Sequence, residues 1–336
     1  MRLTILFLSG ALLYAAGPAT NYKITREIAI GGEGSFDYLT VDSDNNRLFV
    51  SHATQVEVVD IESGKVTGKI QNTPGVHGIA IAREFNRAFI SNGNDDSVTM
   101  FDLKTLETIG KVKTGGKPDA ILYDKFSKRV FVMNAKDSTA TAIDAEKGTV
   151  AGTIPLGGKP EFSVADGNGS AYVNLEDNNA VAHYNTKTLK VVHTWPITGC
   201  EAAVSMALNK KNNRLFIGCK NAKMFVLDSQ SGRMVASAPI GSGVDAAGFD
   251  AESGLIFMSA GDGTLTIVHQ DTSDKYSVAQ TVQTPKGAKT MAFNGKTKRV
   301  YLPVANFGPA SAPTADVPKP KAPVVPGTFR VVEVSR

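Results

Sequence analysis

The chain has 336 residues, and its 36 Lys and Arg exceed its 32 Asp and Glu by only four, giving a formal net charge of +4. No run of basic residues supplies the charged face that phosphate-based capture needs, so nucleic acid is not an expected partner. Hydrophobic residues make up 42% and charged residues 20%, which excludes a disordered composition and allows a large buried core.

The first 19 residues have the composition of a secretory signal peptide. Arg2 provides the positive charge, residues 3–13 are almost all apolar, and small residues lead to a predicted cleavage after Ala19. The alternative is a short buried first helix. No later segment reaches the ~20 apolar residues of a membrane helix. We therefore expect an exported protein without a membrane span, in a periplasm or outside the cell.

One short phrase recurs along the rest of the chain. It reads RLFVS at 47, RAFIS at 87, RVFVM at 129, SAYVN at 170, RLFIG at 214, LIFMS at 255 and RVYLP at 299. The spacing is about 42 residues, the length of a β-propeller blade with four short strands. The sequence therefore predicts an all-β, seven-bladed propeller over 20–336, rather than two β-sandwiches.

The first copy shows the predicted strands in order: 36–42, 47–51, 56–61 and 65–70. The runs are short, rich in Val, Ile, Phe and Tyr, and bounded by turn residues. The last copy offers only 288–293, 299–304 and 328–334. Residues 24–30 resemble the missing fourth strand, so we expect this N-terminal strand to pair onto the C-terminal blade and close the ring.

The repeat resembles the YVTN-type repeat of YncE-like exported bacterial propellers. The resemblance is carried by RAFISN (87–92) with SVTMFD (97–102), by RVFVMN (129–134) with TATAID (139–144), and by AYVN (171–174). It implies an exported seven-bladed protein that binds something rather than transforming it. The arginines that begin the second strands belong to this framework, and we expect them to form structural ion pairs: Arg47, Arg87, Arg129, Arg214 and Arg299.

Ligands of propellers usually bind at one end of the central channel. The residues predicted at the start of the innermost strands, and therefore at this mouth, are Asp37, His77, Asp119, Glu161, Glu201, Asp245 and Lys289. Among them, Asp119, Glu161 and Glu201, with His77, are the candidate metal ligands, because carboxylate oxygens suit Ca²⁺ or Mg²⁺ and one histidine beside them suits a transition metal. The alternative is a solvated polar rim.

Other histidines and the two cysteines are further candidates for functional or structural roles. His52 could approach His77, but a surface histidine is preferred. His183 and His193 are expected to face each other on the outer strands of blade four, an incomplete metal site. Cys200 and Cys219 lie at one end of a single hairpin, and a disulfide is plausible in an oxidising compartment.

Residues 308–327 contain six prolines and are predicted to form a long loop inserted in the last blade, over the channel-mouth face. The resulting hypothesis is a monomeric, non-enzymatic binding module. Its protein or small-molecule ligand is expected at the channel mouth and the proline-rich loop. The alternative is a metal-assisted hydrolase or lactonase that uses the mouth carboxylates.

Overall fold

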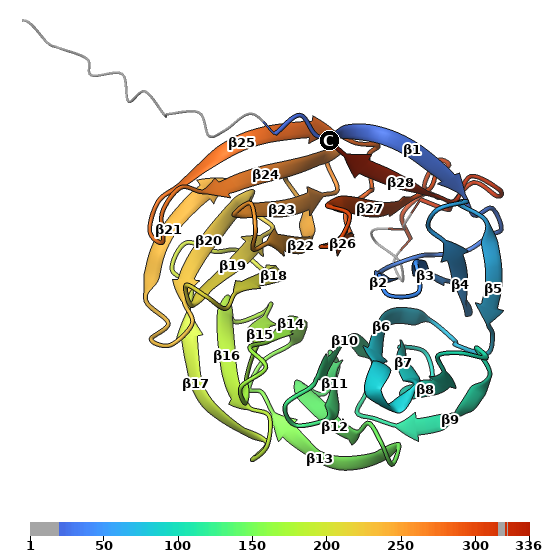
Figure 1. Ribbon diagram of the computed structural model, residues 1–336, viewed down its shortest axis with the longest axis horizontal. Coiled ribbons are helices and arrows are strands. Elements are labelled where there is room, and N and C mark those ends of the chain that lie inside the picture. Colours follow the sequence, from blue (N-terminus) through green and yellow to red (C-terminus); the bar gives the residue numbers. More distant parts are fainter. Residues whose placement is uncertain (1–19, 315–319, 321) are drawn as a thin grey trace, which may run out of the picture.

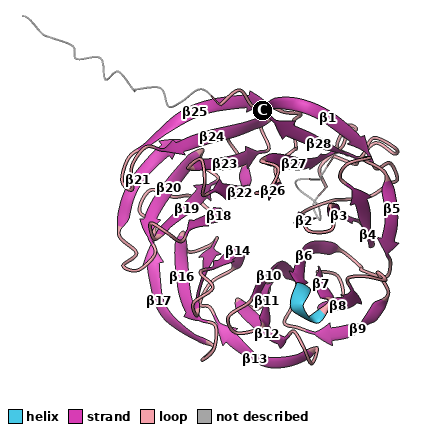
Figure 2. Cartoon of the chain, in the orientation of Figure 1, coloured by secondary structure: helices cyan, strands magenta, loops and turns pink. Residues whose placement is uncertain are grey.

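A computed structural model of the chain describes residues 20–314, 320 and 322–336. The predicted signal peptide and residues 315–319 and 321 of the proline-rich loop lie outside the described residues. The described part contains 28 strands and one short 3-10 helix, η1 (Arg83–Phe85). Seven sheets of four antiparallel strands are arranged around a central axis as the blades of a propeller (Figures 1 and 2).

Each blade runs from an innermost strand beside the axis to an outermost strand at the circumference. Blade one consists of β2 (Leu39–Asp42), β3 (Arg47–His52), β4 (Gln55–Asp60) and β5 (Val66–Ile70). Blade two consists of β6 (Val76–Ala82), β7 (Arg87–Asn92), β8 (Ser97–Asp102) and β9 (Thr108–Lys113). Blade three consists of β10 (Pro118–Asp124), β11 (Arg129–Asn134), β12 (Thr139–Asp144) and β13 (Thr149–Pro155).

The next three blades repeat this order. Blade four consists of β14 (Pro160–Ala165), β15 (Ser170–Leu175), β16 (Ala180–Asn185) and β17 (Lys190–Pro196). Blade five consists of β18 (Ala203–Asn209), β19 (Arg214–Cys219), β20 (Lys223–Asp228) and β21 (Met234–Pro239). Blade six consists of β22 (Val244–Asp250), β23 (Leu255–Ala260), β24 (Thr264–Gln270) and β25 (Tyr276–Gln283).

Blade seven is assembled from both ends of the chain. Its strands are β26 (Ala292–Asn294), β27 (Arg299–Val304), β28 (Arg330–Ser335) and, outermost, β1 (Lys23–Ala29). The pairing of β1 with β28 is antiparallel from Lys23 opposite Ser335 to Ala29 opposite Arg330. The predicted closure of the ring is thus confirmed, because the N-terminal strand β1 supplies the fourth strand of the C-terminal blade.

The hydrophobic core lies between neighbouring blades. The two middle strands of each blade are buried on both faces, since each face packs against another blade, which explains their continuous apolar runs. Phe49 of blade one and Phe101 of blade two, for example, share one cluster with their ring centroids 5.6 Å apart.

The repeat arginines divide into two groups. Arg47, Arg214 and Arg299 form the expected ion pairs, with Asp42, with Asp228 and Asp274, and with Glu333 respectively. Arg87 and Arg129 instead donate to backbone carbonyl oxygens of the following blade. For these two the expected ion pair is replaced by hydrogen bonds that join one blade to the next.

Within the described residues, no helix is long and apolar enough to cross a membrane.

Candidate functional site at the channel mouth

A β-bulge at the start of the innermost strands positions the mouth residues. In blade three, Pro118 pairs with Asn134 and Ile121 with Val132, so Asp119 lies in the irregularity between them. The same interruption surrounds His77 in blade two, Glu161 in blade four and Asp245 in blade six. A bulge bends the strand and redirects a side chain, which here places one polar group from each of these four blades at the same end of the ring.

Hydrogen bonds between blades hold the backbone of these residues. The Ser91 hydroxyl of blade two accepts from the Gly78 amide and donates to the Asp119 carbonyl oxygen of blade three. The Thr290 hydroxyl of blade seven donates to the Asp37 carbonyl oxygen at 2.7 Å. The backbone positions of Asp119 and Asp37 therefore depend on the blade before each of them.

Three side chains converge at this mouth. Nδ1 of His77 lies 2.6 Å from Oδ2 of Asp37 and 3.6 Å from Oδ1 of Asp119. One ligand atom from each of the three residues falls within 4.8 Å of the other two, an arrangement that could hold a metal ion. Imidazole with two carboxylates suits Zn²⁺, Mn²⁺ or another transition metal better than Ca²⁺, which takes oxygen ligands.

The same geometry holds a proton when no metal competes for it. Burial alone would lower the pKa of His77, but the hydrogen bond to Asp37 and the charge of Asp119 outweigh it and raise the pKa above the ordinary histidine value. Burial raises the pKa of Asp119, against the lowering effect of His77. The cluster therefore favours an imidazolium between two carboxylates, and a metal ion must displace that proton.

Two further carboxylates belong to separate ion pairs at this mouth. Asp245 pairs with the Lys289 ammonium group. Glu161 lies 2.9 Å from Nζ of Lys159, which also pairs with Glu176. Burial and then the charge of Asp119 raise the pKa of Glu161 to about 7, although Lys159 opposes them. A carboxyl group that titrates near neutrality can exchange protons with a bound ligand.

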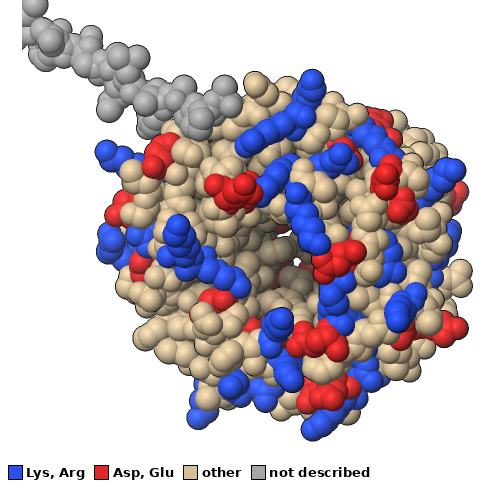
Figure 3. Space-filling view, in the orientation of Figure 1, with Lys and Arg blue, Asp and Glu red and all other residues tan. Residues whose placement is uncertain are grey.

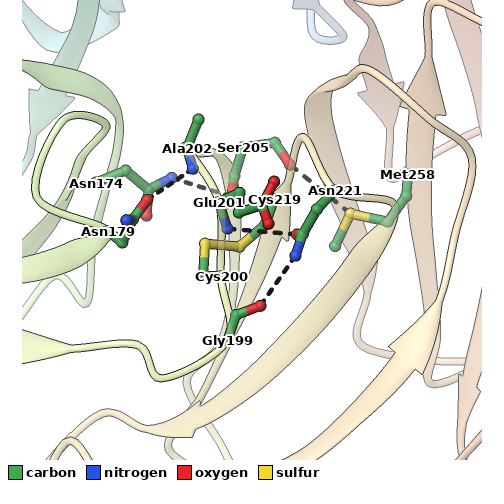
Figure 4. The surroundings of a disulfide bond; sticks show 10 residues. All are labelled: Asn174, Asn179, Gly199, Cys200, Glu201, Ala202, Ser205, Cys219, Asn221 and Met258. Atoms are coloured by element: carbon green, nitrogen blue, oxygen red, sulfur yellow. Dashed lines mark hydrogen bonds between the residues drawn. A yellow bond between two sulfur atoms is a disulfide. The ribbon is translucent and has the colours of Figure 1, made fainter.

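Glu201 stands apart from these groups. In blade five the bulge between Ala203 and Ser205 contains Val204, so a buried apolar side chain occupies the repeat position that carries a carboxylate in four other blades. Glu201 is exposed, and its amide nitrogen lies 3.4 Å from the Asn221 side-chain oxygen (Figure 4). The predicted arc of Asp119, Glu161 and Glu201 is therefore interrupted at blade five.

The segment around Glu201 is fixed by the disulfide between Cys200 and Cys219, whose Cα atoms are 5.6 Å apart. Cys219 pairs with Ala203 in the strand register, and Cys200 reaches it because the chain turns just before β18 (Figure 4). The Asn221 side chain also donates to the Gly199 carbonyl oxygen at 2.9 Å. The disulfide thus fastens the entrance of blade five.

Two aromatic residues that the sequence analysis did not single out lie beneath the mouth. Tyr38 follows Asp37 in blade one, Phe162 follows Glu161 in blade four, and their ring centroids are 5.7 Å apart. The equivalent positions in the other blades carry small residues: Gly78, Ala120, Ser205, Ala246 and Thr290. That exception in the repeat is the sequence signal for the contact. Burial, and then the charges of Asp37 and Asp245, raise the pKa of Tyr38 well above its usual value.

The histidines at 52, 183 and 193 lie outside the cluster of Asp37, His77 and Asp119. His52 is only 3% exposed, with Nδ1 3.3 Å from Glu57 and its ring against Phe329, so the preferred surface placement is wrong. His183 and His193 do pair across β16 and β17, as predicted, with ring centroids 5.9 Å apart.

The described base of the proline-rich loop adjoins the mouth. Phe307 bridges to Val324 and its ring approaches that of Phe36, the residue before Asp37, at 6.3 Å. Phe36 in turn stacks on Phe329 at 4.7 Å. The loop therefore starts and ends beside the segment that carries Asp37, just before β2.

The face drawn in Figure 3 is hollowed at the centre of the ring, and basic and acidic side chains alternate around the hollow. No family model matches the chain, and no curated protein matches it. Among solved structures, the chain resembles one of "Kuenenia stuttgartiensis Hydrazine Synthase" with a TM-score of 0.71, over 88% of this chain and 95% of that chain. At 15% sequence identity this likeness shows the propeller fold alone.

Proposed function

We propose that the protein is an exported binding module of the YncE-like, YVTN-repeat type, which engages its ligand at the channel mouth. The observation that carries the proposal is the convergence of Asp37, His77 and Asp119 from three consecutive blades. Because each residue comes from a different blade, only the folded ring assembles the group. The repeat motifs and the N-terminal composition support the family and the export.

The mouth offers two kinds of recognition to one ligand. The His77 cluster would hold a divalent transition-metal ion, while Lys289 and Glu161 supply charges of opposite sign beside it. The base of the proline-rich loop adjoins Asp37 through Phe36, so a partner that contacts the metal-bearing blades would also meet the loop. This combination favours a ligand with an anionic or metal-binding group.

The experiment is a titration of the mature protein with Zn²⁺, Mn²⁺, Ca²⁺ and Mg²⁺, followed by calorimetry and by the shift in thermal unfolding. A ligand that binds only the native state at 100 times its Kd stabilises it by about 2.7 kcal/mol. We expect one site for Zn²⁺ or Mn²⁺, lost in His77→Ala and Asp119→Asn and retained in the control Glu201→Ala. Absence of binding in the parent would remove the metal from the proposal, and loss in Glu201→Ala would contradict the assigned ligands.

A metal-assisted hydrolase or lactonase is the second candidate, and the specific observation in its favour is the pKa of Glu161 near 7. In such an enzyme Glu161 would act as the general base beside the metal ion. The variant Glu161→Gln separates the two functions. Metal binding should remain in either case, and loss of ester or lactone hydrolysis by the metal-loaded protein would favour the enzyme.

A further inference from the structure

An arginine side chain links neighbouring blades at the end of the ring opposite the channel mouth. Arg47 donates to the Leu103 carbonyl oxygen in the outer turn of blade two at 2.9 Å. Arg129 donates to the carbonyl oxygens of Thr186 and Lys187 in the outer turn of blade four, each at 2.8 Å. In both cases a guanidinium group from the start of a second strand satisfies carbonyl groups of the next blade.

Blade four breaks this pattern because Ser170 occupies the arginine position. Its hydroxyl group is too short to reach the next blade and lies instead 3.0 Å from Nε2 of His183. A pocket of about 320 Å³ opens between blades four and five, lined by Ser170, His183 and the Ser229 turn among others. Ala165 pairs with Ala171 at this end of blade four, and Pro160 with Leu175 at the mouth end, so the pocket is separate from the channel-mouth site.

A depression lies at the equivalent place between blades one and two. Comparison with it shows which contact partners of an arginine side chain are still present in the blade-four pocket. Its lining residues correspond by position in the repeat to residues of the blade-four pocket, Arg47 to Ser170 and Leu103 to Ser229. The correspondence of the turns is set by their hydrogen bonds, since Leu103 donates to Asn86 and Ser229 to Asn213 in the same way. The Ser229 turn is therefore the one that an arginine from blade four would reach.

The other partners of the missing guanidinium group are also present. Arg47 pairs with Asp42 at 2.8 Å, and the corresponding carboxylate in blade four is Asp166, which lines the pocket. Arg47 also lies over the Phe49 ring at 5.3 Å. Tyr172 takes the place of Phe49 in blade four and lines the pocket as well. The pocket thus combines a carboxylate, a carbonyl-bearing turn and an aromatic ring, a set that suits a planar guanidinium cation.

The charge balance of the pocket also favours a cation from outside. The depression between blades one and two carries Arg47, Arg83 and Lys104. Among the described residues, its counterpart is lined by one lysine, Lys210, and by no arginine. Burial and the neighbouring His193 lower the pKa of His183, against the effect of Asp166, and so favour the neutral imidazole, which does not repel a cation.

We propose that the pocket between blades four and five binds a guanidinium group from outside the chain, in the place of the arginine that the repeat lacks there. The group belongs either to a free guanidino compound or to an arginine side chain of another protein. Both sources present the same planar cation to Asp166, Tyr172 and the turn at Ser229.

The single tryptophan of the chain provides the readout, because Trp195 stacks on His183 with ring centroids 5.6 Å apart. The mature protein is titrated with methylguanidinium, with methylammonium as the cation that lacks the planar fork, and binding is followed by Trp195 fluorescence and calorimetry. We expect saturable one-to-one binding of methylguanidinium and at least about tenfold weaker binding of methylammonium. Free L-arginine and a capped Gly-Arg-Gly peptide then distinguish the two sources, and tighter binding of the peptide indicates a protein partner.

Two variants test the assignment to this pocket. Ser170→Arg supplies the internal guanidinium group, so it should abolish binding and raise the thermal midpoint; other blades carry that residue, so the fold should tolerate it. Asp166→Asn should weaken binding at least about tenfold, and the exposed control Glu146→Gln should leave it unchanged. No fluorescence change or heat with methylguanidinium, equal binding of methylammonium, or undiminished binding in Ser170→Arg would overturn the proposal.

Discussion

The rings of Tyr38 and Phe162 meet 5.7 Å apart, although Tyr38 belongs to blade one and Phe162 to blade four. Two blades separate them along one side of the ring and three along the other, so the contact spans the central channel beneath the acidic mouth. It joins the backbone next to Asp37 to the backbone next to Glu161. The two aromatic rings therefore narrow the channel and couple opposite sides of the candidate site.

A double-mutant cycle tests this contact. Tyr38→Ala and Phe162→Ala should each lower the free energy of unfolding, and the double variant should lose less than their sum by about 1 kcal/mol, the usual coupling of an aromatic pair. Denaturant unfolding measures all four proteins. The matched control pairs Tyr38→Ala with Phe126→Ala, an exposed ring elsewhere on the molecule, whose effects should add. Additive losses for Tyr38 and Phe162 would contradict a direct contact.

The fold could be predicted because each blade records its strands locally. Apolar runs between turn residues recur at one period, and the incomplete last copy points to residues 24–30 as the closing strand. The bulge positions of His77, Asp119 and Glu161 follow from the same period. Glu201 does not, because the entrance of blade five is longer and fastened by a disulfide, which moves Val204 into the bulge.

Contacts between distant blades could not be predicted from the period. The repeat marks Tyr38 and Phe162 only as aromatic exceptions at a position of small residues, and the period does not show that blades one and four meet across the channel. His52 is buried because Phe329, from the C-terminal end of the chain, packs on its ring. The serine at position 170 was visible in the repeat, but its consequence depends on the turn that the neighbouring blade places beside it.

Removing the disulfide should destabilise the protein without altering the mouth cluster. Cys200 and Cys219 are separated by 19 residues, and a cross-link over a loop of that length stabilises the native state by about 3 kcal/mol. We expect the double variant Cys200→Ala, Cys219→Ala to lose about this much free energy of unfolding in denaturant titrations. Equal stability of variant and parent under oxidising conditions would show that the cross-link does not contribute.

The contacts of the arginine side chains between blades should be measurable one at a time. Arg129→Ala removes two charge-assisted hydrogen bonds to blade four and should cost about 2 kcal/mol. Arg129→Lys keeps the charge but loses the planar fork, so it should fall between the parent and the alanine variant. Lys187→Ala changes a side chain of the same exposed turn while keeping its carbonyl group, and should have little effect. A similar loss in that control would mean that the turn, rather than the guanidinium contact, is responsible.

The raised pKa of His77 predicts how the cluster contributes to stability at different pH values. The folded protein binds the proton more tightly than the unfolded chain, so the contribution is fully present below the ordinary histidine pKa of about 6.5 and is lost as the pH rises through the raised value. The difference in free energy of unfolding between the parent and His77→Gln should therefore shrink with increasing pH.

The pH experiment has an internal check. Asp37→Asn removes the carboxylate that lies 2.6 Å from Nδ1 of His77, so it should reduce the pH dependence of stability in the same direction as His77→Gln. A metal ion must displace the His77 proton. Affinity for Zn²⁺ or Mn²⁺ should therefore fall about tenfold for each unit by which the pH is lowered below the pKa of His77. A stability difference that grows with pH, or metal affinity independent of pH in this range, would show that the His77 proton is not held between the carboxylates of Asp37 and Asp119.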